Sequence, residues 1–135
     1  MNRLRLAFLV GAIAASTSPA SLQESPRQTP GPPEVQYETV APGVQAAQLL
    51  RTDALRGVIV EIKDIIVGPG KSAADLPVGG YVVTELTSGE AETTIDDRTA
   101  KRRPGEFWVV RPGQKYGVKS LGAMVVLHVT VFSLP

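Results

Sequence analysis

The segment from Gly105 to Ser120 constrains the fold most, because it encodes a strand, a reversal and the start of a second strand. Phe107 to Val110 supply the aromatic and β-branched side chains that suit a pleated, half-buried surface. Arg111-Pro112-Gly113 ends this run, since proline has no N–H for a strand ladder and the glycine tolerates positive φ. The chain is therefore expected to turn back on itself here, as in an antiparallel sheet.

Short alternating segments between glycine- and proline-rich turns extend this pattern. Both faces of Val58 to Val67 mix apolar and charged side chains, which indicates a strand in the middle of a sandwich. Thr87 to Glu90 predicts a hairpin, and Gly117 to Gly122 is expected to separate the last two strands. Val44 to Leu50 fits either a strand or a short helix. Roughly seven or eight short strands without a long helical period predict an all-β, antiparallel sandwich or barrel.

Size and composition exclude several classes of protein. A chain of 135 residues with 43% hydrophobic content can build one core and one domain. It has no cysteine, which excludes disulfides, thiol catalysis and thiolate metal sites. Its single histidine, His128, cannot form within one chain the imidazole clusters that hold most transition metals. A formal net charge of +1 gives no reason to expect nucleic acid as a partner.

Met1 to Ala20 has the layout of a secretory signal. Arg3 and Arg5 precede the apolar run Leu6 to Ala15, and small residues follow at Ser18 to Ala20. We predict a cleaved signal; the alternatives are an ordinary amphipathic helix or a membrane anchor, and an anchor needs about 20 apolar residues. The protein is then exported to the periplasm or the cell exterior, without stable membrane insertion. Twelve basic and thirteen acidic residues remain after cleavage, for a net charge of −1.

A proline-rich linker is predicted to follow the signal. Ser21 to Pro33 contains four prolines and almost no apolar side chain, which is typical of a disordered or polyproline-like tether. A proline-rich ligand for a partner domain is the alternative. Strand periodicity begins at Val35. We therefore divide the chain into a signal over residues 1–20, a linker over 21–34 and a β-barrel domain over 35–135.

Glycine spacing in the segment from Gly105 resembles the second motif of the cupin superfamily. That motif runs glycine, five residues, proline, one, glycine, two, histidine, three, asparagine. Gly105 and Gly113 match its two glycines. Arg111, Tyr116 and Ser120 stand where the motif has proline, histidine and asparagine. The glycine frame is therefore present without the metal-binding histidine.

The first cupin motif is matched in the same partial way. It runs glycine, five residues, histidine, one, histidine, three or four, glutamate, six, glycine. Gly70 and Gly89 fit its two ends, and Leu76, Val78 and Val82 occupy the positions of the metal ligands. Aliphatic side chains offer no N or O donor to a cation. Their burial would instead favour folding by about 1.5 to 3 kcal/mol each.

The resemblance covers residues 58–132 and implies an antiparallel jelly-roll β-barrel. Because the ligand positions carry Leu76, Val78, Val82 and Tyr116, we expect no metal and no cofactor. Cupins commonly associate through their sheets, so a homodimer is also implied. Trp108 and its neighbour Phe107 should then point to opposite faces of one strand, one into the core and the other into a pocket, an interface or solvent.

Three further side chains are candidates for a ligand or catalytic site. Tyr116 fits packing with a polar tip, or a contact to a ligand. His128 points either into the barrel beside Tyr116 or outward, as a structural histidine or as a proton shuttle paired with Tyr116 or Glu85. The ligand-binding residues predicted from the sequence are Tyr116, His128 and Trp108.

A basic patch is formed by Lys101 to Arg103 with Arg98 and Arg111. An exposed edge strand explains it, because lysine and arginine discourage sheet-to-sheet aggregation. Contact with an anionic ligand or phosphate is the alternative.

We predict an exported, metal-free cupin-like domain that binds a small molecule or a partner without catalysis. The alternative is a metal-independent isomerase, epimerase or lyase acting on a sugar or small acid, with His128 and either Tyr116 or Glu85 as the proton-transfer pair. A structural assembly protein is a third possibility.

Overall fold

The folded part of the chain is built from strands connected by turns. The computed structural model describes residues 31–76 and 78–135, so the predicted signal and most of the predicted linker lie outside the described residues. Within those ranges no helix is long and apolar enough to cross a membrane. The strands are β1 (Glu38–Ala41), β2 (Val44–Thr52), β3 (Ile59–Val67), β4 (Ser72–Ala73), β5 (Tyr81–Ser88), β6 (Ala91–Ile95), β7 (Arg98–Arg102), β8 (Phe107–Val110), β9 (Tyr116–Ser120) and β10 (Val125–Ser133).

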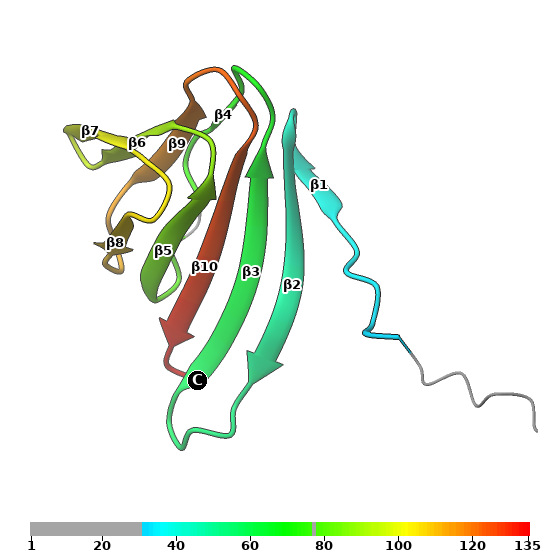
Figure 1. Ribbon diagram of the computed structural model, residues 1–135. Coiled ribbons are helices and arrows are strands. Elements are labelled where there is room, and N and C mark those ends of the chain that lie inside the picture. The colour runs from blue at the N-terminus through cyan, green and yellow to red at the C-terminus, as the bar shows by residue number, and fades with distance from the viewer. Residues whose placement is uncertain (1–30, 77) are drawn as a thin grey trace, which may run out of the picture. The chain divides into compact units, whose positions relative to one another are not determined.

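The strands form two antiparallel sheets that share one core. The larger sheet has the order β1-β2-β3-β10-β5-β8, and the smaller has the order β4-β9-β6-β7. In Figure 1 the smaller sheet lies beside the upper part of the larger one, while the lower ends of β2 and β3 extend beyond it. β8 is an edge strand of the larger sheet, and β7 is an edge strand of the smaller one. Both lie on the left in Figure 1.

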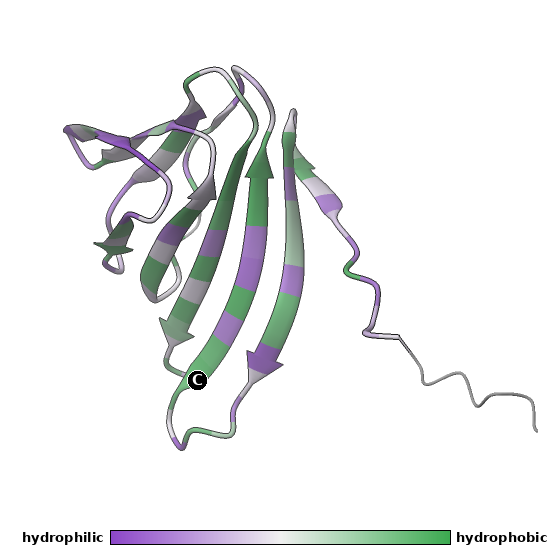
Figure 2. Ribbon diagram, in the orientation of Figure 1, coloured by the Kyte–Doolittle hydropathy of each residue, from purple (hydrophilic) through white to green (hydrophobic). Residues whose placement is uncertain are grey.

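Alternation along each strand determines which side chains enter the core. On β8, Trp108 and Val110 are buried, whereas Phe107 is 62% exposed and Val109 is 53% exposed. Figure 2 shows this alternation as successive bands of hydrophobic and hydrophilic colour along β3 and β10. The core therefore draws every second residue from both sheets, as the period of a strand requires. Its buried members include Val44, Val67, Val82, Leu86, Trp108, Val110, Tyr116, Val118, Val125, Leu127 and Val129.

The structure confirms the all-β, antiparallel prediction, settles one open element and corrects two predictions. Thr87 to Glu90 does not form the predicted hairpin, because β5 and β6 lie in different sheets. Val44 to Leu50, which fitted a strand or a short helix, lies in β2. The prediction that Gly117 to Gly122 only separates two strands is wrong, because Tyr116–Ser120 is β9. Tyr116, Val118 and Ser120 all bury their side chains, and this alternation outweighs the turn preference of the glycine between them.

The four glycines that carried the resemblance occupy a common backbone region. Gly70, Gly89, Gly105 and Gly113 have φ values of 66°, 79°, 88° and 84°. Such values favour glycine because a Cβ would crowd the backbone. At Gly89 a Cβ would also overlap the carbonyl oxygen of Met124. The spacing of these glycines therefore marks positions where the chain turns with a positive φ.

Candidate functional site

The four positions expected to face the barrel centre lie in or against the core. Val82 on β5 and Tyr116 on β9 are buried members of the core, and Leu76 and Val78 pack against it. The backbone N–H of Leu76 donates to the carbonyl oxygen of Tyr116 at 2.9 Å, which ties the segment before β5 to β9. Of these four side chains, only Tyr116 carries a polar atom. The rest of this surface is hydrocarbon.

A polar cluster lies inside the barrel around Trp108. Its indole Nε1–H donates to the hydroxyl oxygen of Tyr116 at 2.9 Å, and the contact is buried. The guanidinium carbon of Arg102 lies 4.9 Å from the centre of the Trp108 ring, within range of a cation–π interaction. Arg102 Nε–H also donates to Thr93 Oγ1 at 3.0 Å. We call Thr84, Thr93, Arg102, Trp108 and Tyr116 the Trp108 cluster.

Thr84 is the unsatisfied member of the Trp108 cluster. Its side chain is fully buried, and its hydroxyl oxygen has no hydrogen bond of good geometry to any described residue. Burial raises the pKa of Tyr116 above 10.0, and the nearby Thr84 hydroxyl, the Trp108 N–H and the charge of Arg102 oppose that rise. The Tyr116 hydroxyl is therefore protonated at neutral pH, and its oxygen accepts the hydrogen bond from Trp108.

A groove of about 890 Å³ opens beside the Trp108 cluster. It is lined by side chains of β7, by Val109 of β8 and by residues of the turns before β7 and after β8. Arg102 belongs to both regions, since it stacks on Trp108 and lines the groove. We call this the β7–β8 groove. Its lining includes Ile95, Asp96, Arg98, Arg102, Val109 and Arg111.

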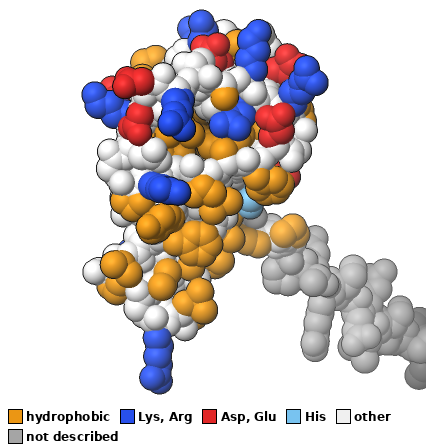
Figure 3. Space-filling view, turned by 90° about the vertical axis from the view of Figure 1, so that its left-hand side faces the viewer, with side chains coloured by type: hydrophobic (Ala, Val, Ile, Leu, Met, Phe, Trp, Pro, Cys, Tyr) orange, Lys and Arg blue, Asp and Glu red, His pale blue; other side chains and the backbone are white. Residues whose placement is uncertain are grey.

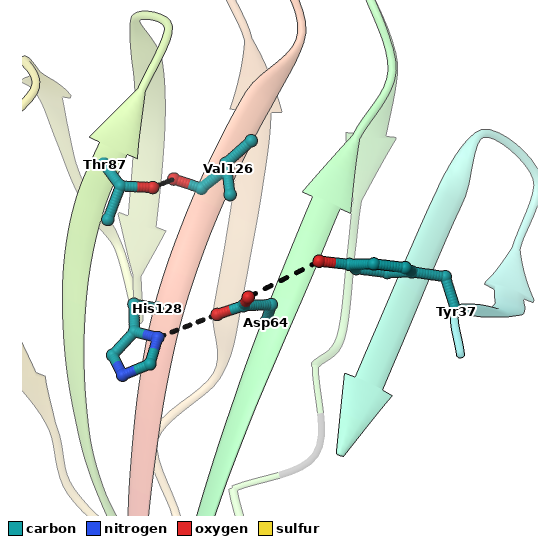
Figure 4. Close-up of polar contacts among 5 residues, drawn as sticks. All are labelled: Tyr37, Asp64, Thr87, Val126 and His128. Atoms are coloured by element: carbon teal, nitrogen blue, oxygen red, sulfur yellow. Dashed lines mark hydrogen bonds and ion pairs between the residues drawn. The ribbon is translucent and has the colours of Figure 1, made fainter. Parts of the chain in front are cut away.

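His128 lies on the other side of the larger sheet. Figure 4 shows its imidazole beside Asp64 of β3, with Tyr37 reaching the same carboxylate from the segment before β1. His128 Nδ1 is 2.7 Å from Asp64 Oδ1, and a carboxylate oxygen accepts, so this nitrogen carries the proton. The Tyr37 hydroxyl donates to Asp64 Oδ2 at 3.4 Å. Glu85 faces His128 from the opposite neighbouring strand. These groups form a polar row on an outer face.

The structure therefore separates two residues that the sequence placed in one hypothetical acid–base pair. Tyr116 is buried inside the barrel, whereas the His128 side chain is 40% exposed on the outer face. Glu85 remains a strand neighbour of His128. Of the three predicted ligand-binding residues, Trp108 and Tyr116 are in direct contact, and His128 lies on the opposite face of the larger sheet from Trp108. Phe107 is exposed on the same outer face, as expected of an aromatic side chain at an interface. The homodimer itself stays a prediction.

Comparison with known proteins identifies the fold of the chain through similar structures. No family model matches the chain, and no curated protein matches its sequence. Its structure is similar to the cupin domain of Schizosaccharomyces pombe Cnp3, with a TM-score of 0.62 and 16% identity over 76% of this chain and 71% of that one. A similar match is an RmlC-like cupin from Shewanella frigidimarina, with a TM-score of 0.60 and 14% identity over 73% and 84% of the two chains. This is a cupin.

A third similar structure is a predicted oxalate decarboxylase from Thermotoga maritima. The TM-score is 0.62 at 16% identity, over 76% of the present chain and 95% of that chain. Identities this low establish the jelly-roll fold of the chain and nothing about its activity. The resemblance inferred from glycine spacing is nevertheless confirmed at the level of fold.

The sequence analysis missed the inward role of Arg102. The basic patch was attributed to an exposed edge, and β7 is indeed the edge strand of the smaller sheet. Lys101 is exposed there, but Arg102 is half-buried against Trp108. Alternation along β7 was the available signal, because neighbouring residues of a strand face opposite sides. The same signal applied to Thr84, which shares the face of β5 with the buried Val82 and Leu86.

Proposed function

We propose that this cupin is an exported domain that binds a small molecule at the β7–β8 groove without a metal and without catalysis. One observation carries the proposal: the groove is lined by an arginine that stacks on the buried Trp108. Ligand sites are concave and combine apolar walls with a few polar groups in fixed positions. The Trp108 ring and the Thr93 hydroxyl hold Arg102 in this way.

The apolar motif positions support the non-metal part of the proposal. A divalent ion exchanges its water shell for several N or O ligands. Leu76, Val78 and Val82 supply none, and the described residues contain no cluster of three or more His, Asp or Glu side chains placed to hold an ion. Elemental analysis of protein purified without added metal tests this directly. Stoichiometric iron, manganese, zinc or nickel would refute it.

Binding at the groove can be followed through the only tryptophan of the chain, Trp108. We expect its fluorescence to change saturably with at least one member of a panel of sugars, sugar acids and aromatic acids. Ala100→Leu places extra volume in the groove and should weaken that binding by about tenfold or more. Lys101→Leu is the matched control, because Lys101 lies next to Ala100 on the opposite face of β7. Equal loss in both variants would place the site elsewhere.

Export rests on the amino-terminal pattern of Arg3 and Arg5 before an apolar run. Expression of the full chain in a bacterial host, followed by mass measurement of the periplasmic protein, tests it. Cleavage near Ala20 is the expected result. A protein that keeps its full mass in the cytoplasmic fraction would contradict export and leave the binding proposal untouched.

Acid–base catalysis by His128 is the weaker proposal. Asp64 orients its imidazole, which is how a histidine base is positioned in many enzymes. However, His128 lies on the outer face of the larger sheet, and Trp108 and Tyr116 point into the barrel on the other side of that sheet. An isomerase, epimerase or lyase would have to work at that face with Glu85 as the partner. Loss of any detected turnover in His128→Gln, with groove binding unchanged, would support it.

A further inference from the structure

Three arginines line the β7–β8 groove without a carboxylate partner in the described part of the chain. The ion pairs found there are Arg51 with Glu61, Lys63 with Glu61, and His128 with Asp64. None involves Arg98, Arg102 or Arg111, although all three line one groove. Figure 3, which views the molecule from the side of β7 and β8 in Figure 1, shows charged side chains gathered over the upper part and hydrophobic ones below.

Arg102 is held in place by Thr93 and Trp108, and most of its N–H donors make no hydrogen bond to a described residue. A guanidinium has five N–H donors, and in Arg102 Nε–H alone is engaged in a hydrogen bond to a described residue. Its plane rests on Trp108, which limits its conformations before any ligand arrives. A preorganised guanidinium loses less rotamer entropy on binding, and its fork matches the oxygens of a carboxylate or phosphate.

Gln114 fixes the turn that carries Arg111. Its Oε1 accepts from the backbone N–H of Arg111 at 2.8 Å, and its Nε2–H donates to Asp96 Oδ2 at 3.0 Å. Asp96 N–H in turn donates to the carbonyl oxygen of Lys115 at 2.8 Å. The turn before β7 and the turn after β8 are thus tied together across the groove. Arg111 is presented from a fixed backbone.

Two aspartates also line the groove, so its three arginines and two aspartates leave a net charge of +1. Asp96 Oδ1 accepts from the backbone N–H of Lys115 at 3.0 Å, and its other oxygen accepts from Gln114. Its carboxylate is therefore committed to the two turns. Asp97 is exposed to solvent. Neither forms an ion pair with the lining arginines, so the free donors of this groove are cationic.

We propose that the β7–β8 groove binds the carboxylate or phosphate group of a small anionic molecule through Arg98, Arg102 and Arg111, a step that rests on the small-molecule binding proposed above. Ile95 and Val109 line the same groove and give it an apolar wall. The ligand class is therefore a small molecule with one oxyanion group and an apolar body. Its charge is paired with guanidinium groups, and its body covers Ile95 and Val109.

The test is isothermal titration calorimetry of the full mature domain with three probes. Benzoate has the carboxylate and the apolar body, benzyl alcohol has the same body without the charge, and inorganic phosphate has the charge alone. Arg111→Gln and Arg102→Gln each remove one cation of the groove. Lys101→Gln removes the same charge from the opposite face of β7 and is the matched control. Arg111 is exposed, so its variant keeps the core intact.

We expect benzoate to bind and to weaken by about tenfold or more in both arginine variants, with less than about a twofold change in Lys101→Gln. Binding should also weaken as salt rises from roughly 0.02 to 0.2 M, because exposed charges are screened. Phosphate binding with the same arginine dependence, in the absence of benzoate binding, supports the inference and assigns the phosphate class. If all anionic probes fail, or if Lys101→Gln weakens binding as much as Arg111→Gln, the inference is overturned. Benzyl alcohol binding as tightly as benzoate also overturns it and leaves the proposed small-molecule function standing.

Discussion

Polar side chains inside the barrel and those on the outer face of the larger sheet are arranged in opposite ways. Inside, the Trp108 cluster is buried and leaves the Thr84 hydroxyl without a good partner. Outside, the carboxylate of Asp64 is bonded to both His128 and Tyr37 while water can still reach the row. The outer row contains the groups commonly used in catalysis, and the inner cluster contains the unmet hydrogen-bonding capacity.

The buried cluster and the exposed row differ in how much free energy a new hydrogen bond could contribute there. An exposed pair has already exchanged water for a protein partner at little net gain. A buried polar group without a partner costs about 1 to 3 kcal/mol, which a ligand or a bound water can recover. The Asp64–His128 pair therefore offers less to a ligand than Arg102, which lines the β7–β8 groove and joins it to the Trp108 cluster.

The largest expected change in the free energy of unfolding distinguishes the buried face of β8 from its exposed face. Val110→Ala, inside the barrel, should lower the free energy of unfolding by about 2 to 3 kcal/mol, because burial is lost and a cavity remains. Val109→Ala, its exposed neighbour, should change it by no more than about 0.5 kcal/mol. Urea unfolding of both variants measures the difference. Equal losses would mean that the outer face of β8 is covered by something, such as a second copy of the chain.

Trp108→Phe tests the inner cluster itself. The change removes the N–H bonded to Tyr116 and weakens the contact with Arg102. We expect a loss of about 1 to 2 kcal/mol, because the Tyr116 hydroxyl becomes a second buried group without a partner. Tyr116→Phe in the same background should recover part of it. A double variant less stable than the sum of the single changes would contradict the pairing.

Sequence alone could predict the strands, because alternation and turns are local properties. It could also predict the fold through Gly70, Gly89, Gly105 and Gly113, since each occupies a backbone conformation that favours glycine. The direction of His128 was left open at the sequence level. Val125, Leu127 and Val129 form an apolar face of β10 opposite His128, and that face is the buried one. Alternation along the strand was therefore the available signal for an outward His128.

The site was harder to predict because it depends on contacts between distant segments. Arg102 meets Trp108 across the gap between two sheets, and no local pattern encodes that meeting. The same holds for Thr84 and Thr93, two buried threonines with opposite hydrogen bonding. Their difference appears only once the strands are in register.

Replacing each of these two threonines by valine should change the free energy of unfolding in opposite directions. Thr84→Val replaces an unpartnered buried hydroxyl by a methyl group and should stabilise the fold by about 1 kcal/mol. Thr93→Val should destabilise it by about 1 kcal/mol or more, because Thr93 accepts from Arg102 and donates to the carbonyl oxygen of Ala100. Thermal and urea unfolding give both values. If Thr84→Val is destabilising, its hydroxyl has a partner such as a buried water.

The smallest effect is expected on the outer face. Asp64→Asn removes the charge that faces His128, yet both side chains are partly open to water, so the free energy of unfolding should fall by no more than about 1 kcal/mol. Glu85→Gln, on the other strand beside His128, is the matched control and should change it by less than about 0.5 kcal/mol. A loss in Asp64→Asn as large as that in Trp108→Phe would mean that the outer row is shielded from solvent in the working protein. The exposed apolar residues around it would then be the contact surface of a partner.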